Sequence, residues 1–228
     1  MIRSVLHVPA LLGDAFYLLL HDKHTGRGHL APRITRLAMG AAMLSELYCA
    51  GLAGYRPERG REGVVFLPER YPVMPDLVQH LALAEIETES QPPGAWMRLL
   101  GPLVIGPIAE RLERDGRLEP LHVPRLELPL GFVLTRPRRW RPVTPLVGET
   151  PALYLGGQLD NGRALQMEEL TLVGLTYACG LHRHVFPFSS KAVAEWVAQE
   201  ALRLPPPLPE LLRGLNQTVN QIVATGRH

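Results

Sequence analysis

The strongest constraint on the fold is residues 11–21, LLGDAFYLLLH, which are apolar on nearly every side when drawn as a helix. A helix without a polar face belongs in a core, so this segment predicts a central helix that others cover. Residues 22–26, DKHTG, then supply turn residues and a glycine stop. A second helix is predicted from Pro32, which suits a first helical turn. Its small residues would let another helix approach closely, namely Ala38, Ala41, Ala42 and Ser45.

Helical segments and glycine- or proline-rich breaks alternate along the rest of the chain. A strand at 64–67 can pair with the segment around Tyr55 across a charged turn. Residues 146–163 hold several glycines and a proline, and are expected to form an irregular loop. Further helices are predicted at 77–86 with Asp76 as its cap, from Trp96 with interruptions at 101–102 and 106–107, and at 108–114, 168–179, 191–202 and 211–224.

The composition is that of one globular domain over residues 1–228, with 46% apolar residues and a net charge of +2. The two cysteines, Cys49 and Cys179, lie in apolar helical contexts and are expected to be reduced thiols. No apolar run reaches the roughly 18 residues that a membrane span needs. We therefore expect a cytoplasmic protein whose membrane contact, at the inner face, is peripheral.

A basic segment at residues 135–142, TRPRRWRP, stands out after an apolar strand candidate at 131–134. Its guanidinium groups crowd around one indole, in Arg136, Arg138, Arg139, Trp140 and Arg141. Arginine binds phosphate bidentately and indole favours the level of lipid headgroups, so the segment suits an anionic lipid surface. The same cluster would also fit nucleic acid phosphates, an acidic partner, a subunit interface, or a solvated loop whose indole packs on its own domain.

No pattern in the sequence indicates catalysis, a metal site or a cofactor. The close histidine pairs, at 21 and 24 and at 182 and 184, lack the cysteine or carboxylate spacing of a zinc site. Asp14, Asp22 and Glu46 fall in the central helices, but nothing marks two of them as an acid and base pair. Phosphate-binding loops, dinucleotide fingerprints and nucleophile elbows are missing. We therefore expect a protein that is not an enzyme.

The order of these segments resembles the Golgi-phosphoprotein family over roughly residues 11–145. The opening match consists of Leu18–Leu20, Asp22, Thr25–Arg27, Leu44, Glu46–Leu47 and Gly51. An acidic-ended helix, a proline break, Trp96 and a charged helix ending near Leu118 continue it, followed by the strand and basic segment. The family's eukaryotic members are peripheral Golgi adaptors that bind phosphatidylinositol 4-phosphate, and related sequences occur in bacteria. Their hairpin at the place of the basic segment is implicated in oligomerisation and membrane contact.

The resemblance fails at the family's lipid pocket, where phosphoinositide-binding members carry one Trp and three Arg. This chain has Ala31, Gly40, Pro102 and Ile105 at those places, so none of the four is kept. Arg33 and Arg36 lie nearby in the sequence and are candidates to replace this charge at a lipid or phosphate site, although they would project differently. The expectation is therefore a looser site for anionic lipid or phosphate rather than one for a particular phosphoinositide.

Together these features predict a mainly α-helical domain like that of the Golgi-phosphoprotein family, with apolar central helices, surrounding amphipathic helices and a protruding β-hairpin that holds out its indole. The resemblance implies a non-enzymatic, peripheral membrane-associating adaptor that meets anionic phospholipid. The alternative is a cytosolic homo-oligomeric interaction protein that uses the basic hairpin for subunit assembly. A winged-helix-like DNA regulator is a third alternative, although nucleic acid is not the expected partner.

Overall fold

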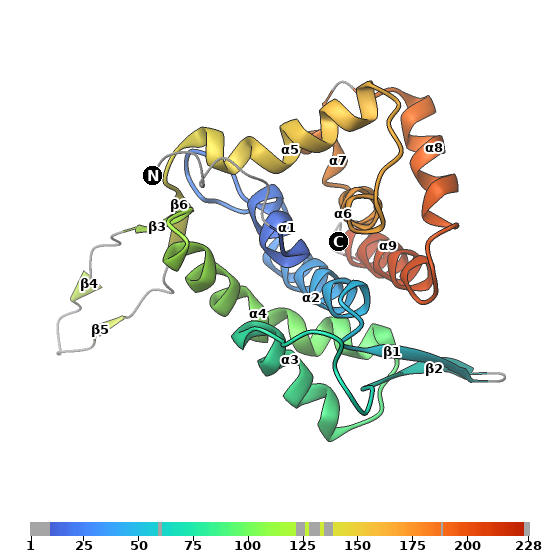
Figure 1. Ribbon diagram of the computed structural model, residues 1–228. Helices are drawn as coiled ribbons and strands as arrows, with labels where there is room; N and C mark the ends of the chain where they lie inside the picture. Colours follow the sequence, from blue (N-terminus) through green and yellow to red (C-terminus); the bar gives the residue numbers. More distant parts are fainter. Residues whose placement is uncertain are drawn as a thin grey trace.

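The computed structural model describes these parts of the chain: residues 10–58, 61–121, 126–127, 133–134, 139–187 and 189–225. Helices α1 (Leu12–Leu20) and α2 (Pro32–Cys49) lie at the centre, and the other helices surround them (Figure 1). Every residue of α1 is buried, because no side of this helix offers a polar face to water. The expected mainly α-helical fold around apolar central helices is confirmed.

The two long helices α2 and α4 (Pro93–Arg114) run antiparallel and touch through glycines. A Cβ atom on Gly40 would lie 2.0 Å from the carbonyl oxygen of Met97, and a Cβ on Gly101 would lie 1.9 Å from that of Arg36. Neither position can carry a side chain unless a helix backbone moves. The close approach expected of α2 is therefore present, and glycines set its distance.

Helix α4 is continuous, so the interruptions expected at 101–102 and 106–107 are wrong. Its core-facing residues recur at every fourth position, in the buried Leu100, Val104, Ile108 and Leu112. Pro102 lies on the exposed side, where the carbonyl group that loses its amide partner can bond to water. Burial of one face thus outweighs two helix-breaking prolines. The helix ends as predicted, at Asp115 and the left-handed Gly116 (φ 68°).

The segment between α2 and α4 confirms the expected hairpin and helix. Strands β1 (Gly54–Glu58) and β2 (Arg61–Phe66) pair antiparallel, with Gly54 opposite Phe66. Helix α3 (Leu77–Thr88) follows, and the Asp76 side chain caps it by accepting from the amides of Val78 (2.7 Å) and Gln79 (2.9 Å). In Figure 1 the hairpin extends away from the helices, while α3 lies along α4.

A second hairpin system follows α4. Strand β3 (Leu118–Leu121) pairs antiparallel with β6 (Arg139–Pro142), and β4 (Leu126–Glu127) pairs with β5 (Val133–Leu134). The pair β4–β5 lies farther from the helical body than β3–β6 (Figure 1). The protruding hairpin is thus present, and the strand expected at 131–134 is described at its last two residues, since 131–132 lie outside the described part.

Helix α5 (Pro145–Asp160) overturns the irregular loop expected at 146–163. The Thr144 side chain caps the helix by accepting from the amide of Val147 at 3.4 Å, and Pro145 occupies the first helical position. A buried line with four-residue spacing, formed by Val147, Pro151 and Leu155, then holds the helix on the core, where it packs against α1. Tertiary packing therefore overrides a sequence rich in glycine.

The C-terminal helices close the bundle beside α2. They are α6 (Met167–Ala178), α7 (His182–Val185), α8 (Lys191–Ala201) and α9 (Leu208–Thr225). The helices predicted at 168–179, 191–202 and 211–224 are confirmed with small shifts of their ends, and the one-turn helix α7 was not expected. The Ser190 side chain caps α8 by accepting from the amide of Val193 at 3.3 Å.

The longest helix, α4, has 22 residues, and α2 and α9 have 18 each. Charged and polar residues interrupt the apolar sequence of all three. Within the described ranges, none of the helices has both the length and the apolar content to cross a bilayer.

Candidate functional site

The structure places part of the predicted basic segment in strand β6. Arg136 and Arg138 lie outside the described residues. Arg139 is exposed on β6. The Nε atom of Arg141 donates to Oε1 of Glu119 on the paired strand at 2.7 Å, and both side chains are about half exposed (48% and 44%). The guanidinium of Arg139 is therefore more available to an external anion than that of Arg141.

Trp140 lies against the helical body and does not project from the hairpin tip. Its side chain is half-buried on the hydrophobic core, and its Nε1 donates to Oε2 of Glu113 on α4 at 2.7 Å. The turn before α2 packs on the same strand, since a Cβ on Gly26 would lie 1.9 Å from the Trp140 carbonyl oxygen. The indole thus anchors β6 at the base of the hairpin, which differs from the expectation that the hairpin holds it out.

Arg33 and Arg36 lie in the first turns of α2, and both are exposed. Ala31, the residue before the helix, provides no side-chain cap. In the described part of the chain, no carboxylate lies within ion-pair distance of either guanidinium. An uncapped helix N-terminus has a positive partial charge, so two guanidinium groups and the helix dipole favour an anion at the same place.

Gly40, which the sequence resemblance aligns with one arginine of the family's lipid pocket, is covered by α4. Gly40 touches the backbone of Met97, so the arginine of phosphoinositide-binding members would not fit there. The contacts of residue 40 with 97 and of residue 36 with 101 define the antiparallel register of α2 and α4. Continued by one turn, this register brings Arg33 close to the level of Ile105, where those members carry an arginine on the facing helix. Arg33 therefore places a positive charge on α2 near the level of Ile105 of α4.

A buried polar network joins α1, α2, α3 and α4, and no sequence pattern connects its members. The Arg111 guanidinium donates to Oδ1 of Asp14 through Nε (2.9 Å) and Nη2 (2.7 Å), and its Nη1 pairs with Asp76. Glu46 accepts from the Gly13 amide at 2.7 Å and from Gln79 Nε2 at 2.9 Å. The Arg111 guanidinium therefore pairs with two carboxylates, the buried Asp14 and the partly exposed Asp76.

The charge balance of this network favours proton uptake. Burial raises the pKa of Asp14 from 3.8 to about 7, although Arg111 acts to lower it. Burial likewise raises the pKa of Glu46, which has no cation in direct contact. Both carboxyl groups are 3% exposed, and neither lines the cavity described below. We therefore interpret this network as one that holds the four helices together.

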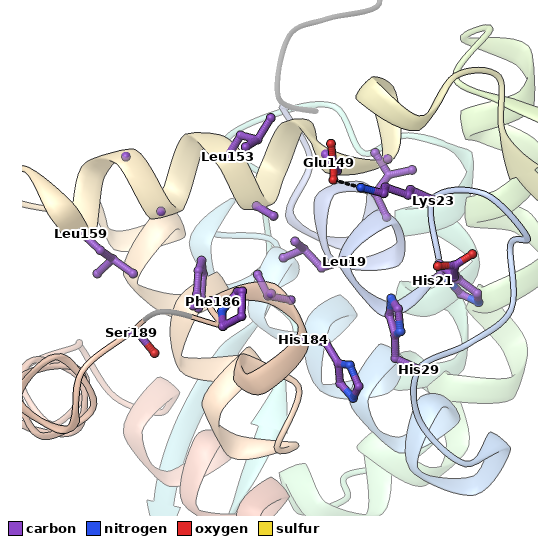
Figure 2. A pocket seen from close by; sticks show the side chains of 18 of the residues that line it. Leu19, His21, Lys23, His29, Glu149, Leu153, Leu159, His184, Phe186 and Ser189 are labelled. Atoms are coloured by element: carbon purple, nitrogen blue, oxygen red, sulfur yellow. Dashed lines mark hydrogen bonds and ion pairs between the residues drawn. The ribbon is translucent and has the colours of Figure 1, made fainter.

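A cavity of about 490 Å³ lies between α1, α5 and α7. Figure 2 shows α5 running across its top, with Phe186 and Leu159 at one end and the paired Lys23 and Glu149 at the other. Leu19 of α1 reaches into it from the centre of the molecule. The glycines of α5 at 148, 156 and 157, which led to the wrong loop prediction, line this cavity.

Histidines from distant segments meet at the cavity. The rings of His29 and His184 stack with centroids 5.0 Å apart, and His21 Nδ1 bonds to the Tyr17 carbonyl oxygen at 2.8 Å. Burial lowers the pKa of His21, and burial followed by repulsion from His184 lowers that of His29. These shifts favour the neutral imidazole of His21 and of His29. No sequence signal joins positions 29 and 184, so sequence analysis missed this pair.

The described residues contain no group of three or more His, Cys, Asp or Glu side chains that could hold a metal ion. The histidines that are close in sequence have different surroundings. His21 stacks on Tyr17 with centroids 4.1 Å apart, while His24 is exposed. His182 stacks on Tyr177 at 4.5 Å, and His184 turns to His29.

Comparison with known proteins supports the resemblance seen in the sequence. The family model described as Golgi phosphoprotein 3 (GPP34) matches residues 12–216 of the 228. No match is found among the curated proteins. The matched range runs from the central helix α1 into α9 and includes both hairpin regions. The chain therefore belongs to the Golgi phosphoprotein 3 family.

Proposed function

We propose that this protein is a non-enzymatic, peripheral adaptor that binds anionic phospholipid headgroups at a membrane surface. The observation that carries the proposal is the pair of exposed arginines, Arg33 and Arg36, at the uncapped N-terminus of α2. Family membership agrees with an adaptor role. In this proposal Arg33, near the level of Ile105, takes the role of an arginine that phosphoinositide-binding members carry on the facing helix.

The energetics favour reversible binding to a charged surface rather than a tight pocket. Each basic residue close to an anionic bilayer contributes about 1 kcal/mol, and this contribution weakens with salt. Arg33, Arg36 and Arg139 are exposed, and we include Arg136, Arg138 and Arg141 in the contact because they share the basic segment. In this proposal Trp140 keeps β6 on the body, and the protein acts at the cytoplasmic face of the membrane.

The site we propose recognises phosphate in general. Arginine forks fit any phosphate oxygen pair, and a free amide N–H at a helix N-terminus donates to any small anion. With Gly40 packed on the Met97 backbone, there is no side chain at that position to select a sugar headgroup. We therefore expect similar binding to different anionic lipids of equal charge.

Vesicle co-sedimentation tests the proposal. The wild-type protein is expected to sediment with vesicles that contain phosphatidylglycerol and to remain in solution with phosphatidylcholine alone. Arg33→Glu/Arg36→Glu should lose most of this binding. The charge-matched control, Arg163→Glu/Lys191→Glu, changes exposed residues of the α5–α6 loop and of α8 and should bind like the wild type. Equal losses in both variants would contradict a site at α2.

The same protein samples also test the alternative that the basic hairpin joins subunits. Light scattering of the wild type and of Arg139→Glu reports whether the hairpin joins subunits. The lipid proposal is wrong, and the hairpin serves assembly, if two results occur together. The wild type does not bind vesicles, and Arg139→Glu converts a wild-type oligomer into monomers.

A further inference from the structure

The cavity beside α5 shares no lining residue with the proposed headgroup contact and has the size of a ligand site. Its volume is about 490 Å³, and small-molecule sites span about 300–1,000 Å³. Much of its wall is aliphatic or aromatic, with Leu19 from α1, Leu159 from α5 and the buried Phe186 after α7 (Figure 2). Such a wall favours a hydrocarbon chain, because apolar surface leaves water on binding.

Two adjacent glycines leave part of this space open. A Cβ on Gly148 would lie 2.9 Å from Pro142 and 3.0 Å from Lys23, so packing explains that glycine. At Gly156 and Gly157, in contrast, an added Cβ would meet no atom within 4 Å. Glycine destabilises a helix interior relative to alanine, and here the missing side chains relieve no contact inside the protein. Both glycines line the cavity, Gly156 half-buried and Gly157 exposed, so this part of the wall carries no side chain.

The polar groups at the cavity indicate the charge of the ligand's head. Lys23 is the one Lys or Arg among the described lining residues, and Glu149 neutralises it. Asp22 and Asp160 also line the cavity, so an anionic head would meet net negative charge. The stacked His29 and His184 can exchange hydrogen bonds with a hydroxyl or ester group.

We propose that this cavity binds an uncharged single-chain lipid, such as a monoacylglycerol or a long-chain alcohol. The chain lies along the apolar wall beneath Gly156 and Gly157, and the hydroxyl head faces His29 and His184. Neither Arg33 nor Arg36 lines this cavity, so substitutions at different residues test the two proposals.

Titration calorimetry with monooleoylglycerol, oleate and oleylamine below their aggregation concentrations tests the chain and the head together. The wild type is expected to bind monooleoylglycerol saturably, with one ligand per chain. Oleate should bind about tenfold more weakly, because its carboxylate meets Asp22, Asp160 and Glu149. Oleate or oleylamine binding as tightly as monooleoylglycerol would overturn the assignment of an uncharged head.

Gly156→Leu fills the cavity from its wall and should weaken monooleoylglycerol binding by at least about tenfold. Its melting temperature should be no lower than that of the wild type, since leucine favours the helix and meets open space. Gly106→Leu is the matched control, because Gly106 also faces open space but lies on α4, away from the cavity. Wild-type affinity in Gly156→Leu, or no saturable binding by the wild-type protein, would overturn the site.

Discussion

Arg111 is the residue on which four helices of the central bundle depend. Its guanidinium joins Asp14 of α1 to Asp76 at the start of α3, and Gln79 extends the network to Glu46 of α2. Arg111 is separated from Asp14 by 97 positions, so no local pattern could predict the contact. The sequence did place Asp14 and Glu46 in central helices, where ionised carboxyl groups require partners.

Arg111→Met should lower the free energy of unfolding by about 3–5 kcal/mol at neutral pH, because the buried Asp14 would lose the cation it contacts directly. Urea denaturation followed by circular dichroism measures this loss. Arg114→Met, one turn from Arg111 and exposed, is the control and should change stability little. Equal stability of the two variants would show that the network contributes nothing.

The raised carboxyl pKa values make stability depend on pH. Asp14 titrates near 3.8 in the unfolded chain and at about 7 in the folded protein, so the folded state binds the proton more tightly. The free energy of unfolding should therefore fall as pH rises from about 4 to about 7, by at most about 4 kcal/mol from this group.

Glu46→Gln should make this dependence shallower, because it removes one buried negative charge and its repulsion of Asp14. Urea denaturation of the wild type and the variant across this pH range provides the comparison. A pH dependence as steep in Glu46→Gln as in the wild type would rule out proton uptake by this network.

At the scale of elements, a glycine or proline can either end a helix or lie inside a continuous one, and the sequence alone could not distinguish the two cases. Pro102 is tolerated on the exposed side of α4, and Pro151 lies in a buried line of α5, where packing supports the helix. Where a helix was capped and amphipathic, as at Asp76 and Ser190, the predictions were confirmed. Local signals thus identify ends, whereas continuity through α4 and α5 depends on partners distant in sequence.

Two substitutions on α4 distinguish a glycine that packing requires from one that it does not. Gly101→Ala should destabilise the protein by about 1–3 kcal/mol, since its Cβ would meet the Arg36 carbonyl oxygen. Gly106→Ala should stabilise it by about 0.5–1 kcal/mol, because the new methyl group meets open space and alanine favours the helix. Thermal denaturation of both variants tests the assignment, and the same sign of change in both would refute it.

For the whole molecule, the sequence led to the family and to the mainly helical body, because an all-apolar helix allows few alternatives to a central position. It did not reveal where Trp140 rests, since Glu113 contacts it across 27 positions. The cavity was equally hidden, because residues near 20, 150 and 185 form it together. These features depend on how α1, α5 and α7 meet, which no segment specifies alone.

The central claim is that exposed arginines at the start of α2 meet anionic lipid. The most direct measurement is the dissociation constant for phosphatidylglycerol-containing vesicles at increasing salt, for the wild type and Arg33→Glu/Arg36→Glu. We predict that wild-type binding weakens steadily with salt, and that the variant binds at least about tenfold more weakly at low salt. Wild-type binding that does not change with salt, or equal affinities of the two proteins, would contradict the claim.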